Sequence, residues 1–135
     1  MNASQYFRPT YAAARAAFRA AAAARGLKVE SHRNPAKGAE GEELTTDVAE
    51  LGPADARRLM IVVSGTHGAE GFCGSGIQVG WLAADHPLPA DTAILFVHAL
   101  NPYGFSHVRR VTEDNVDLNR NFVDHGNAKD RKSVV

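Results

Sequence analysis

A short apolar run, Leu59-Met-Ile-Val-Val63, sets the strongest limit on the fold, because Ser-Gly-Thr-His-Gly-Ala-Glu-Gly follows it at once at residues 64–71. An uncharged run rich in β-branched residues predicts a buried strand. In open α/β sheets, ligands bind beyond the carboxyl ends of the strands. The polar segment therefore marks the place where we expect a site.

A second apolar run, residues 92–97, follows after a helical pattern that ends near Ala84, with Asp85-His-Pro-Leu-Pro89 closing the helix. Strand, helix and strand make a βαβ unit, so residues 59–64 and 92–97 should pair in parallel at the centre of the sheet. Gly76 and Gly80 of the intervening helix should allow close approach to that sheet.

The rest of the chain supplies further elements around this unit. An Ala-rich amphipathic helix is predicted from Phe7 through Arg25, and strands are predicted over residues 27–32 and 44–51. The first of these strands alternates polar and apolar residues, which is typical of an edge strand. The fold class expected is α/β, with a central mixed or parallel sheet between flanking helices in three layers.

Composition narrows the function. The 135 residues fit one domain, and lysine plus arginine balances aspartate plus glutamate at 15 each, which argues against nucleic acid or an anionic membrane as partner. The one cysteine, Cys73, permits no internal disulfide and should be a small buried residue. No apolar run reaches membrane-spanning length. The Arg-rich start has the look of a transit peptide, but it lacks a cleavage signal, so a packed helix and a cytoplasmic location are expected.

His67 and Glu70 are the candidate metal ligands. An imidazole and a carboxylate three residues apart can face one ion, and with a third ligand and a water they make the ligand set of a catalytic zinc site. The pattern is weak alone, because a solvated loop can carry the same two residues by chance. A serine hydrolase is excluded at Ser75, which lacks the flanking glycines of Gly-x-Ser-x-Gly.

A polar stretch over residues 114–122, Asp-Asn-Val-Asp-Leu-Asn-Arg-Asn-Phe, has no helical or strand period. It is either a solvated surface loop or a rigid loop that presents arginine and asparagine to an anionic ligand. Arginine binds a carboxylate in bidentate fashion, and a neighbouring asparagine adds a neutral donor.

Taken in order, these motifs resemble the zinc carboxypeptidase family, the carboxypeptidase A-like metallopeptidases. The motifs that carry the resemblance are His67-Gly-Ala-Glu70, Asn101-Pro-Tyr-Gly104, Arg110 and Asp117-Leu-Asn-Arg-Asn-Phe122. The residues around these motifs, 98–105 and 113–122, resemble those of an uncharacterised bacterial branch of the family. The match spans roughly residues 60 to 125, and four ordered motifs are far more specific than one.

The resemblance implies a role for each matched residue. His67 and Glu70 would bind Zn²⁺, and Asn119 with Arg120 would hold the free carboxylate of the substrate. Arg110 would stabilise charge on the scissile carbonyl, with Arg109 as its rival. The implied fold is that of the N-terminal part of a zinc-peptidase-like catalytic domain over residues 1–125, incomplete at its C-terminus, with a structureless tail over 126–135.

Two expected parts of such a site are missing. The family has a third zinc ligand, a histidine, and a general-base glutamate, both well downstream of the Asn-Arg motif, but after Arg120 this chain has only His125 and no glutamate. His98, His107 or His125 could complete the zinc shell, although each is more readily a loop or supporting histidine.

Three hypotheses of function therefore stay open. The chain is a metallocarboxypeptidase-like hydrolase, an N-acyl-amino-acid deacylase of the aspartoacylase type, or a truncated, inactive fragment that keeps the carboxylate clamp. The expected partner is a peptide or acyl-amino-acid with a free carboxylate.

Overall fold

The computed structural model describes residues 2–122 and shows a mixed α/β fold, which confirms the predicted class. The expected tail over 126–135 lies outside these residues. The elements are, in chain order, η1 (Ala3–Tyr6), α1 (Tyr11–Ala24), β1 (Val29–Lys37), β2 (Glu43–Leu51), β3 (Arg58–Val63), α2 (Gly68–Ala83), β4 (Thr92–His98) and α3 (Pro102–Ser106). Within that range, no helix is both long and apolar enough to span a bilayer.

In the described residues the sheet has four strands, in the order β1-β2-β4-β3. β3 and β4 are parallel, with Met60 opposite Ile94 and Val62 opposite Phe96, whereas the β1–β2 and β2–β4 pairs are antiparallel. The parallel pair joined through α2 and the edge position of β1 are both confirmed. The sheet is therefore mixed.

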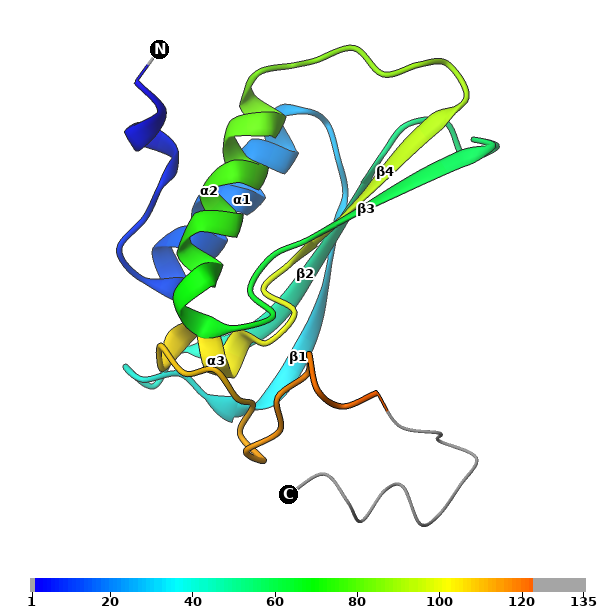
Figure 1. Cartoon of the computed structure of the whole chain (residues 1–135). Helices are drawn as coiled ribbons and strands as arrows, with labels where there is room; N and C mark the ends of the chain where they lie inside the picture. The colour runs from blue at the N-terminus through cyan, green and yellow to red at the C-terminus, as the bar shows by residue number, and fades with distance from the viewer. Residues whose placement is uncertain (1, 123–135) are drawn as a thin grey trace.

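Both long helices lie on the same face of the sheet (Figure 1). The main core joins Phe18 and Ala22 of α1 to Leu82 of α2 and Phe96 of β4, all of which are almost fully buried. In residues 2–122 no long helix covers the opposite face. This described part thus has two layers, because its two long helices pack beside each other rather than on opposite faces.

The predicted burial of β3 is wrong. Leu59 is 58% exposed, Met60 56% and Ile61 57%, because among residues 2–122 the strand order places β3 at the edge of the sheet instead of its centre. The helices cover β2 and β4 instead, through Ala49 and Phe96. The apolar run predicted a strand correctly but could not predict what would cover it.

The predicted role of two α2 glycines is also corrected. A Cβ on Gly76 would overlap the ring of Phe7, and one on Gly80 would contact the ring of Tyr6, so these glycines admit the N-terminal segment and not the sheet. The glycine beside the sheet is Gly74, which lies against Ser64. Cys73 is exposed, contrary to expectation, because its position on α2 belongs to neither of these contacts.

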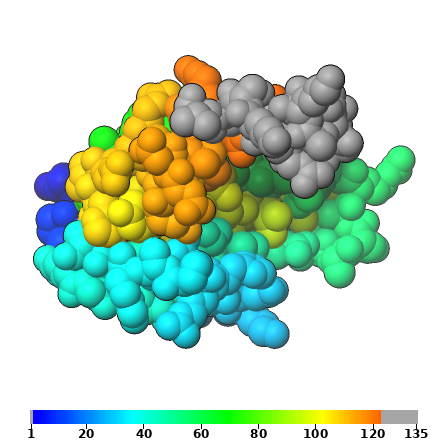
Figure 2. Space-filling model, turned by 90° about the horizontal axis from the view of Figure 1, so that it is seen from below, coloured from blue at the N-terminus to red at the C-terminus, as the bar shows by residue number. Residues whose placement is uncertain are grey.

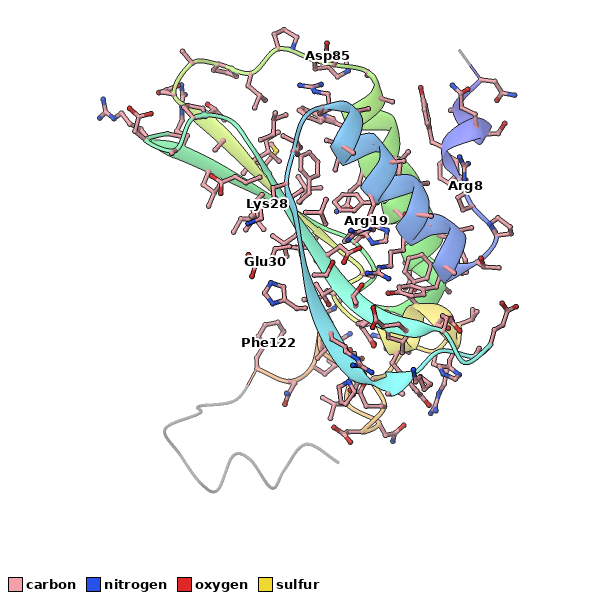
Figure 3. All side chains as sticks on the ribbon, turned by 180° about the vertical axis from the view of Figure 1, so that it is seen from behind. Arg8, Arg19, Lys28, Glu30, Asp85 and Phe122 are labelled. Atoms are coloured by element: carbon pink, nitrogen blue, oxygen red, sulfur yellow. The ribbon has the colours of Figure 1, made fainter. Side chains whose placement is uncertain are left out.

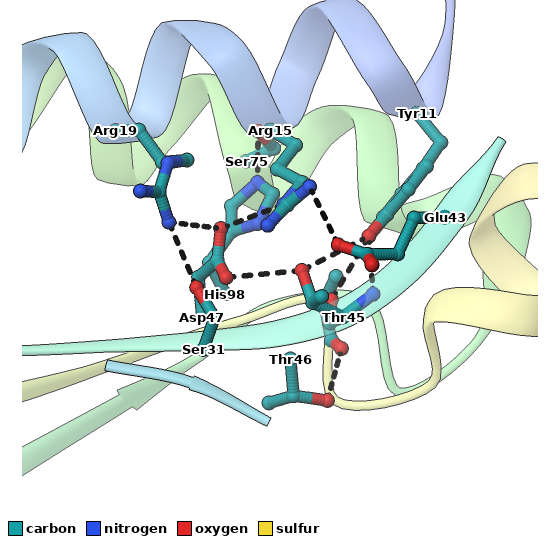
Figure 4. Close-up of polar contacts among 11 residues, drawn as sticks. Tyr11, Arg15, Arg19, Ser31, Glu43, Thr45, Thr46, Asp47, Ser75 and His98 are labelled. Atoms are coloured by element: carbon teal, nitrogen blue, oxygen red, sulfur yellow. Dashed lines mark hydrogen bonds and ion pairs between the residues drawn. The ribbon is translucent and has the colours of Figure 1, made fainter. Parts of the chain in front are cut away.

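A buried polar network ties α1 to the sheet (Figure 4). The fully buried Asp47 of β2 accepts hydrogen bonds from Arg15 Nε (3.0 Å) and Thr45 Oγ1 (3.0 Å), and Arg19 lies 3.6 Å from the same carboxylate. Burial raises the pKa of Asp47, but hydrogen bonds from Ser31, Arg15 and Thr45 outweigh it and hold the pKa below its usual range. A buried charge of this kind requires its partners.

His98, at the end of β4, lies beside this network and is fully buried. Its ring stacks on Phe18 at 4.6 Å, and its Nε2 lies 2.9 Å from Ser75 Oγ, while Nδ1 has no partner among the described residues. Burial lowers the pKa of His98 to about 4, although Asp47 acts in the opposite direction. The imidazole is therefore neutral at pH 7.

Acid should destabilise the fold through His98 before it affects the carboxylates. The folded pKa of about 4 lies below the unfolded value of 6.5, so this contribution is complete above pH 6.5 and is lost as the pH falls to about 4. The loss should be about 3 kcal/mol, at 1.36 kcal/mol per pKa unit. Urea unfolding at a series of pH values measures it.

The variant His98→Gln should be less stable at pH 7 but should lose most of the pH dependence between 6.5 and 4. His32→Gln is the matched control, because His32 is an exposed histidine on β1. Asp47 contributes little to a loss in this window, since its pKa is lowered from 3.8 in the fold and most of its own effect therefore falls below that pH. An unchanged slope in His98→Gln would contradict the assignment.

Candidate metal and carboxylate site

The site begins where β3 and β4 end, because their pairing continues into the two loops that follow. Ser64 N–H donates to Val97 O (3.0 Å), Leu100 N–H donates to Ser64 O (2.9 Å), and Asn101 N–H donates to Gly65 O (2.9 Å). Gly65 has φ +67°, and a Cβ at this position would lie 3.0 Å from the Cα of Ala99 in the second loop. Glycine accommodates this conformation and this close approach. The residues after β3 are thus fixed at the carboxyl edge of the sheet.

The Asn-Pro-x-Gly motif supports the start of α2. Asn101 is the N-cap of the short helix α3, and its Oδ1 accepts a hydrogen bond from Gly104 N–H (2.8 Å). Gly68 N–H donates to Arg109 O (2.9 Å), and Arg109 N–H donates to Gly104 O (2.8 Å). A Cβ on Gly68 would overlap the carbonyl groups of Gly104 and Arg109. The two glycines let three backbone segments meet beside His67.

His67 and Glu70 lie side by side at the start of α2. His67 is the residue just before the helix and Glu70 is in its first turn, and Nδ1 of the imidazole lies 3.5 Å from Glu70 Oε1. The other ring nitrogen, Nε2, lies 2.9 Å from Asp117 Oδ1. An ionised carboxylate only accepts, so Nε2 carries a proton, and in a neutral imidazole the lone pair is then on Nδ1. That lone pair is the one beside Glu70.

Asp117 joins three parts of the site. Its Oδ1 also accepts from Asn119 N–H (2.9 Å), and its Oδ2 accepts from Arg110 Nε (2.7 Å). The hydrogen bond from His67, followed by that from Arg110, lowers the pKa of Asp117 to about 2. Sequence reasoning gave Asp117 no role. The signal was its place at the head of Asp-Leu-Asn-Arg, but nothing in the sequence brings residue 117 to residue 67.

The remaining predicted residues are less closely joined. Arg120 Nη1 donates to the carbonyl of Asn119 (2.9 Å), and both side chains are exposed. Within residues 2–122 neither side chain forms a hydrogen bond or an ion pair with His67, Glu70 or Arg110. Arg109, the rival of Arg110, reaches Asn115 Oδ1 at 3.4 Å instead of Asp117. The roles given to these side chains stay predictions.

The donors present fit part of a zinc site. His67 and Glu70 supply an imidazole nitrogen and a carboxylate, both of which are zinc ligands in proteins. No group of three histidine, cysteine, aspartate or glutamate side chains that could hold a metal occurs in the described range. His98 is buried against Phe18 and Ser75, and His107 Nε2 contacts the carbonyl of Lys37 (3.1 Å). His125 lies outside that range.

The loops that carry the site are supported from below by the β1–β2 hairpin. Asn34 donates to Glu113 (2.7 Å), and Ser106 Oγ accepts from Ala39 N–H (2.9 Å). Figure 2 shows this end of the molecule, with residues 100–122 in yellow to orange lying against the cyan hairpin. The hairpin therefore helps to fix the segment that contains Arg110.

Residues 7–133 match the family model DUF2817, whose description is "Protein of unknown function". The chain belongs to the DUF2817 family. Among curated proteins no match is found. The match covers nearly the whole sequence of this DUF2817 protein, including every candidate site residue.

Several solved structures are similar to this DUF2817 protein. An aspartoacylase family protein from Mesorhizobium loti is 28% identical, with a TM-score of 0.49, over 71% of this chain and 30% of that one. A glutaminyl cyclase from Macrostomum lignano is 17% identical, with a TM-score of 0.47, over 67% of this chain and 32% of that one. The chain thus spans about a third of the length of these proteins.

Replacing Gly68 should disturb the site by separating the backbone segments that meet beside His67. Gly68→Ala should cost about 1–3 kcal/mol of unfolding free energy, because the added methyl group overlaps two carbonyl groups. It should also change the NMR shifts of the His67 ring by displacing it from Asp117. Gly80→Ala is the control: its Cβ meets only the Tyr6 ring, and alanine gains about 1 kcal/mol of helix propensity. Equal losses of unfolding free energy in the two variants would contradict a special role of Gly68 in this backbone packing.

Proposed function

We propose that this chain builds the metal- and carboxylate-binding half of a zinc-dependent, metallocarboxypeptidase-like hydrolase that cleaves an amide bond next to a free carboxylate. The observation that supports it is the position of the His67 ring between two carboxylates. Its Nε2 is bound to Asp117 at 2.9 Å, which leaves Nδ1 beside Glu70 at 3.5 Å.

This arrangement is typical of metal-ligating histidines. Such a histidine donates its second ring N–H to a carboxylate, which fixes the tautomer and raises the basicity of the ligating nitrogen. His67 and Glu70 would hold the metal, and the metal would supply an acidified water and a Lewis acid for the scissile carbonyl. The 12% exposure of the His67 side chain limits competition from solvent, while Glu70 remains 69% exposed.

Arg110 would stabilise the negative charge that develops on the oxygen of the scissile carbonyl. Its Nε is bound to Asp117, and the side chain is still 53% exposed, so other N–H groups of the guanidinium remain accessible. A guanidinium held by one edge is pre-organised to stabilise charge that develops in the transition state. Asn119 and Arg120, both exposed on the following turn, would bind the carboxylate of the substrate.

Two alternatives use the same residues. An N-acyl-amino-acid deacylase of the aspartoacylase type would also cleave an amide beside a carboxylate. A truncated, inactive carboxylate-binding fragment fits the ligand count, because catalytic zinc sites use three protein ligands and residues 2–122 offer two. A general base is also needed, and Glu70 cannot serve as one while it coordinates zinc.

Zinc binding tests the metal half of the proposal. Calorimetry should show weak binding to this chain, and His67→Ala should abolish it. Asp117→Asn should weaken binding about 10- to 100-fold, because it removes the charge that orients His67. Asp114→Asn, an exposed carboxylate of the same loop, is the matched control and should bind as the native chain does. Tight stoichiometric binding that survives His67→Ala would place the ligands elsewhere.

Turnover separates the complete enzyme from the fragment. The zinc-loaded chain should be inactive or nearly so against libraries of C-terminal peptides and N-acyl-amino-acids, and activity should appear in a reading frame extended past codon 135. Zinc-dependent turnover by these residues alone, abolished in Glu70→Ala or Arg110→Ala, would overturn the fragment hypothesis. The library that is cleaved would distinguish peptidase from deacylase.

A further inference from the structure

Each segment that reaches the candidate site turns through one residue of positive φ. These residues are Gly65 (φ +67°) after β3, Ala99 (+58°) after β4, Val108 (+53°) after α3 and Asn115 (+62°) in the turn that follows. The remaining non-glycine residue of this kind in the described range, Asp85, lies beyond the other end of α2 (Figure 3). Glycine and asparagine tolerate this left-handed region, whereas a β-branched residue is an outlier there. Val108 is therefore the residue least suited to its backbone conformation.

Val108 takes this conformation because it ends α3 in a Schellman motif. Val108 N–H donates to Phe105 O (3.3 Å), and Arg109 N–H donates to Gly104 O (2.8 Å). These are the two hydrogen bonds of that motif, and His107 is the C-cap, so Val108 occupies the position that is usually glycine. The branched side chain makes the left-handed conformation unfavourable, and the hydrogen bonds around it must hold it in place.

The residue after Val108 is fixed to the start of α2. Arg109 O accepts from Gly68 N–H (2.9 Å), so a backbone carbonyl caps the first amide of that helix. A Cβ on Gly68 would lie 2.6 Å from this oxygen, and one on Gly104 would lie 2.7 Å from it. Both glycines thus leave room for the carbonyl of Arg109, which can occupy this position only while Val108 stays left-handed.

Arg110 follows at once, so its direction depends on the same turn. Its Nε donates to Asp117 Oδ2 (2.7 Å), and the other oxygen of that carboxylate lies 2.9 Å from His67 Nε2. A change of φ at Val108 from +53° to the extended value of about −120° would redirect the chain beyond it. That change would withdraw the carbonyl of Arg109 from α2 and the guanidinium of Arg110 from Asp117.

We propose that Val108 is a strained hinge that positions Arg110, and that the loop over residues 108–117 opens when Val108 relaxes to an extended conformation. The arrangement described above is the closed state. Strained residues persist where the surrounding structure holds them, and they cluster at active sites and switch segments. A ligand that binds Arg110 in its closed position would select that state. This last step rests on the proposed function, whereas the hinge rests on the backbone alone.

Hydrogen exchange of the Gly68 amide measures the opening, because this N–H is released when the carbonyl of Arg109 leaves it. The measurement uses NMR on the metal-free chain. Val108→Gly should slow the exchange about tenfold relative to the native chain, because glycine removes the strain of the closed state. Val108→Asn should slow it less, and Val108→Ile should leave it unchanged. The reverse order, with glycine fastest and isoleucine slowest, would show that side-chain packing holds the loop and would overturn the hinge.

The Arg110 Nε–H tests whether the hinge positions this side chain. It should slow by the same factor as the Gly68 amide in Val108→Gly, because one opening releases both groups. Its NMR signal is assigned by its loss in Arg110→Lys. Slowing at Gly68 without slowing at Arg110 would overturn the positioning role.

Two controls separate the hinge from general stability. The Phe96 amide, in the centre of the sheet, reports global unfolding and should slow less than the Gly68 amide in Val108→Gly. Equal slowing at both would overturn the hinge. Asp114→Gly alters an exposed residue of the same loop that has an ordinary φ, and it should slow neither amide. A chain that binds no zinc would overturn the proposed function but not the hinge, because these measurements need no metal.

Discussion

The parallel pairing of β3 with β4 holds the candidate site in place, and the other elements around that site are positioned from it. The pairing runs past the strand ends, through Ser64, Gly65 and the loop that leads to Asn101, so that two connections leave the sheet locked together. α2 then begins from a fixed point, and α3 packs against that point. A side chain that must meet groups from distant parts of the chain needs such a rigid origin. His67 has one because the sheet supplies it.

Much of this could be predicted from the residues. The apolar runs at 59–63 and 92–97 indicated two strands and their parallel relation, because a buried crossover helix leaves few other topologies. The Ala-rich segment indicated α1, although the helix starts at Tyr11 and not at Phe7. His67 and Glu70 were predicted as neighbours from their spacing alone. A sequence pattern predicts structure correctly when all the residues that determine it lie within one helix or strand.

What could not be predicted depends on distance in the sequence. Asp117 meets His67 across fifty positions, and Asp47 meets Arg15 across thirty-two, and no period in the sequence encodes either contact. The exposure of β3 was not predicted, because an apolar run indicates a strand that favours burial but does not indicate which element would cover it. The α2 glycines failed similarly, because Gly76 faces Phe7, a residue that no local pattern brings there.

The shared carboxylate of Asp117 has a thermodynamic consequence. Asp117 accepts hydrogen bonds from an imidazole and a guanidinium, so a cation bound at His67 and an anion bound at Arg110 would both act on the same carboxylate. Their binding free energies are then coupled, and linkage requires the coupling to be reciprocal: whatever factor the metal applies to the affinity of the anion, the anion applies to the metal. The site would respond to its two ligands as a single cooperative unit.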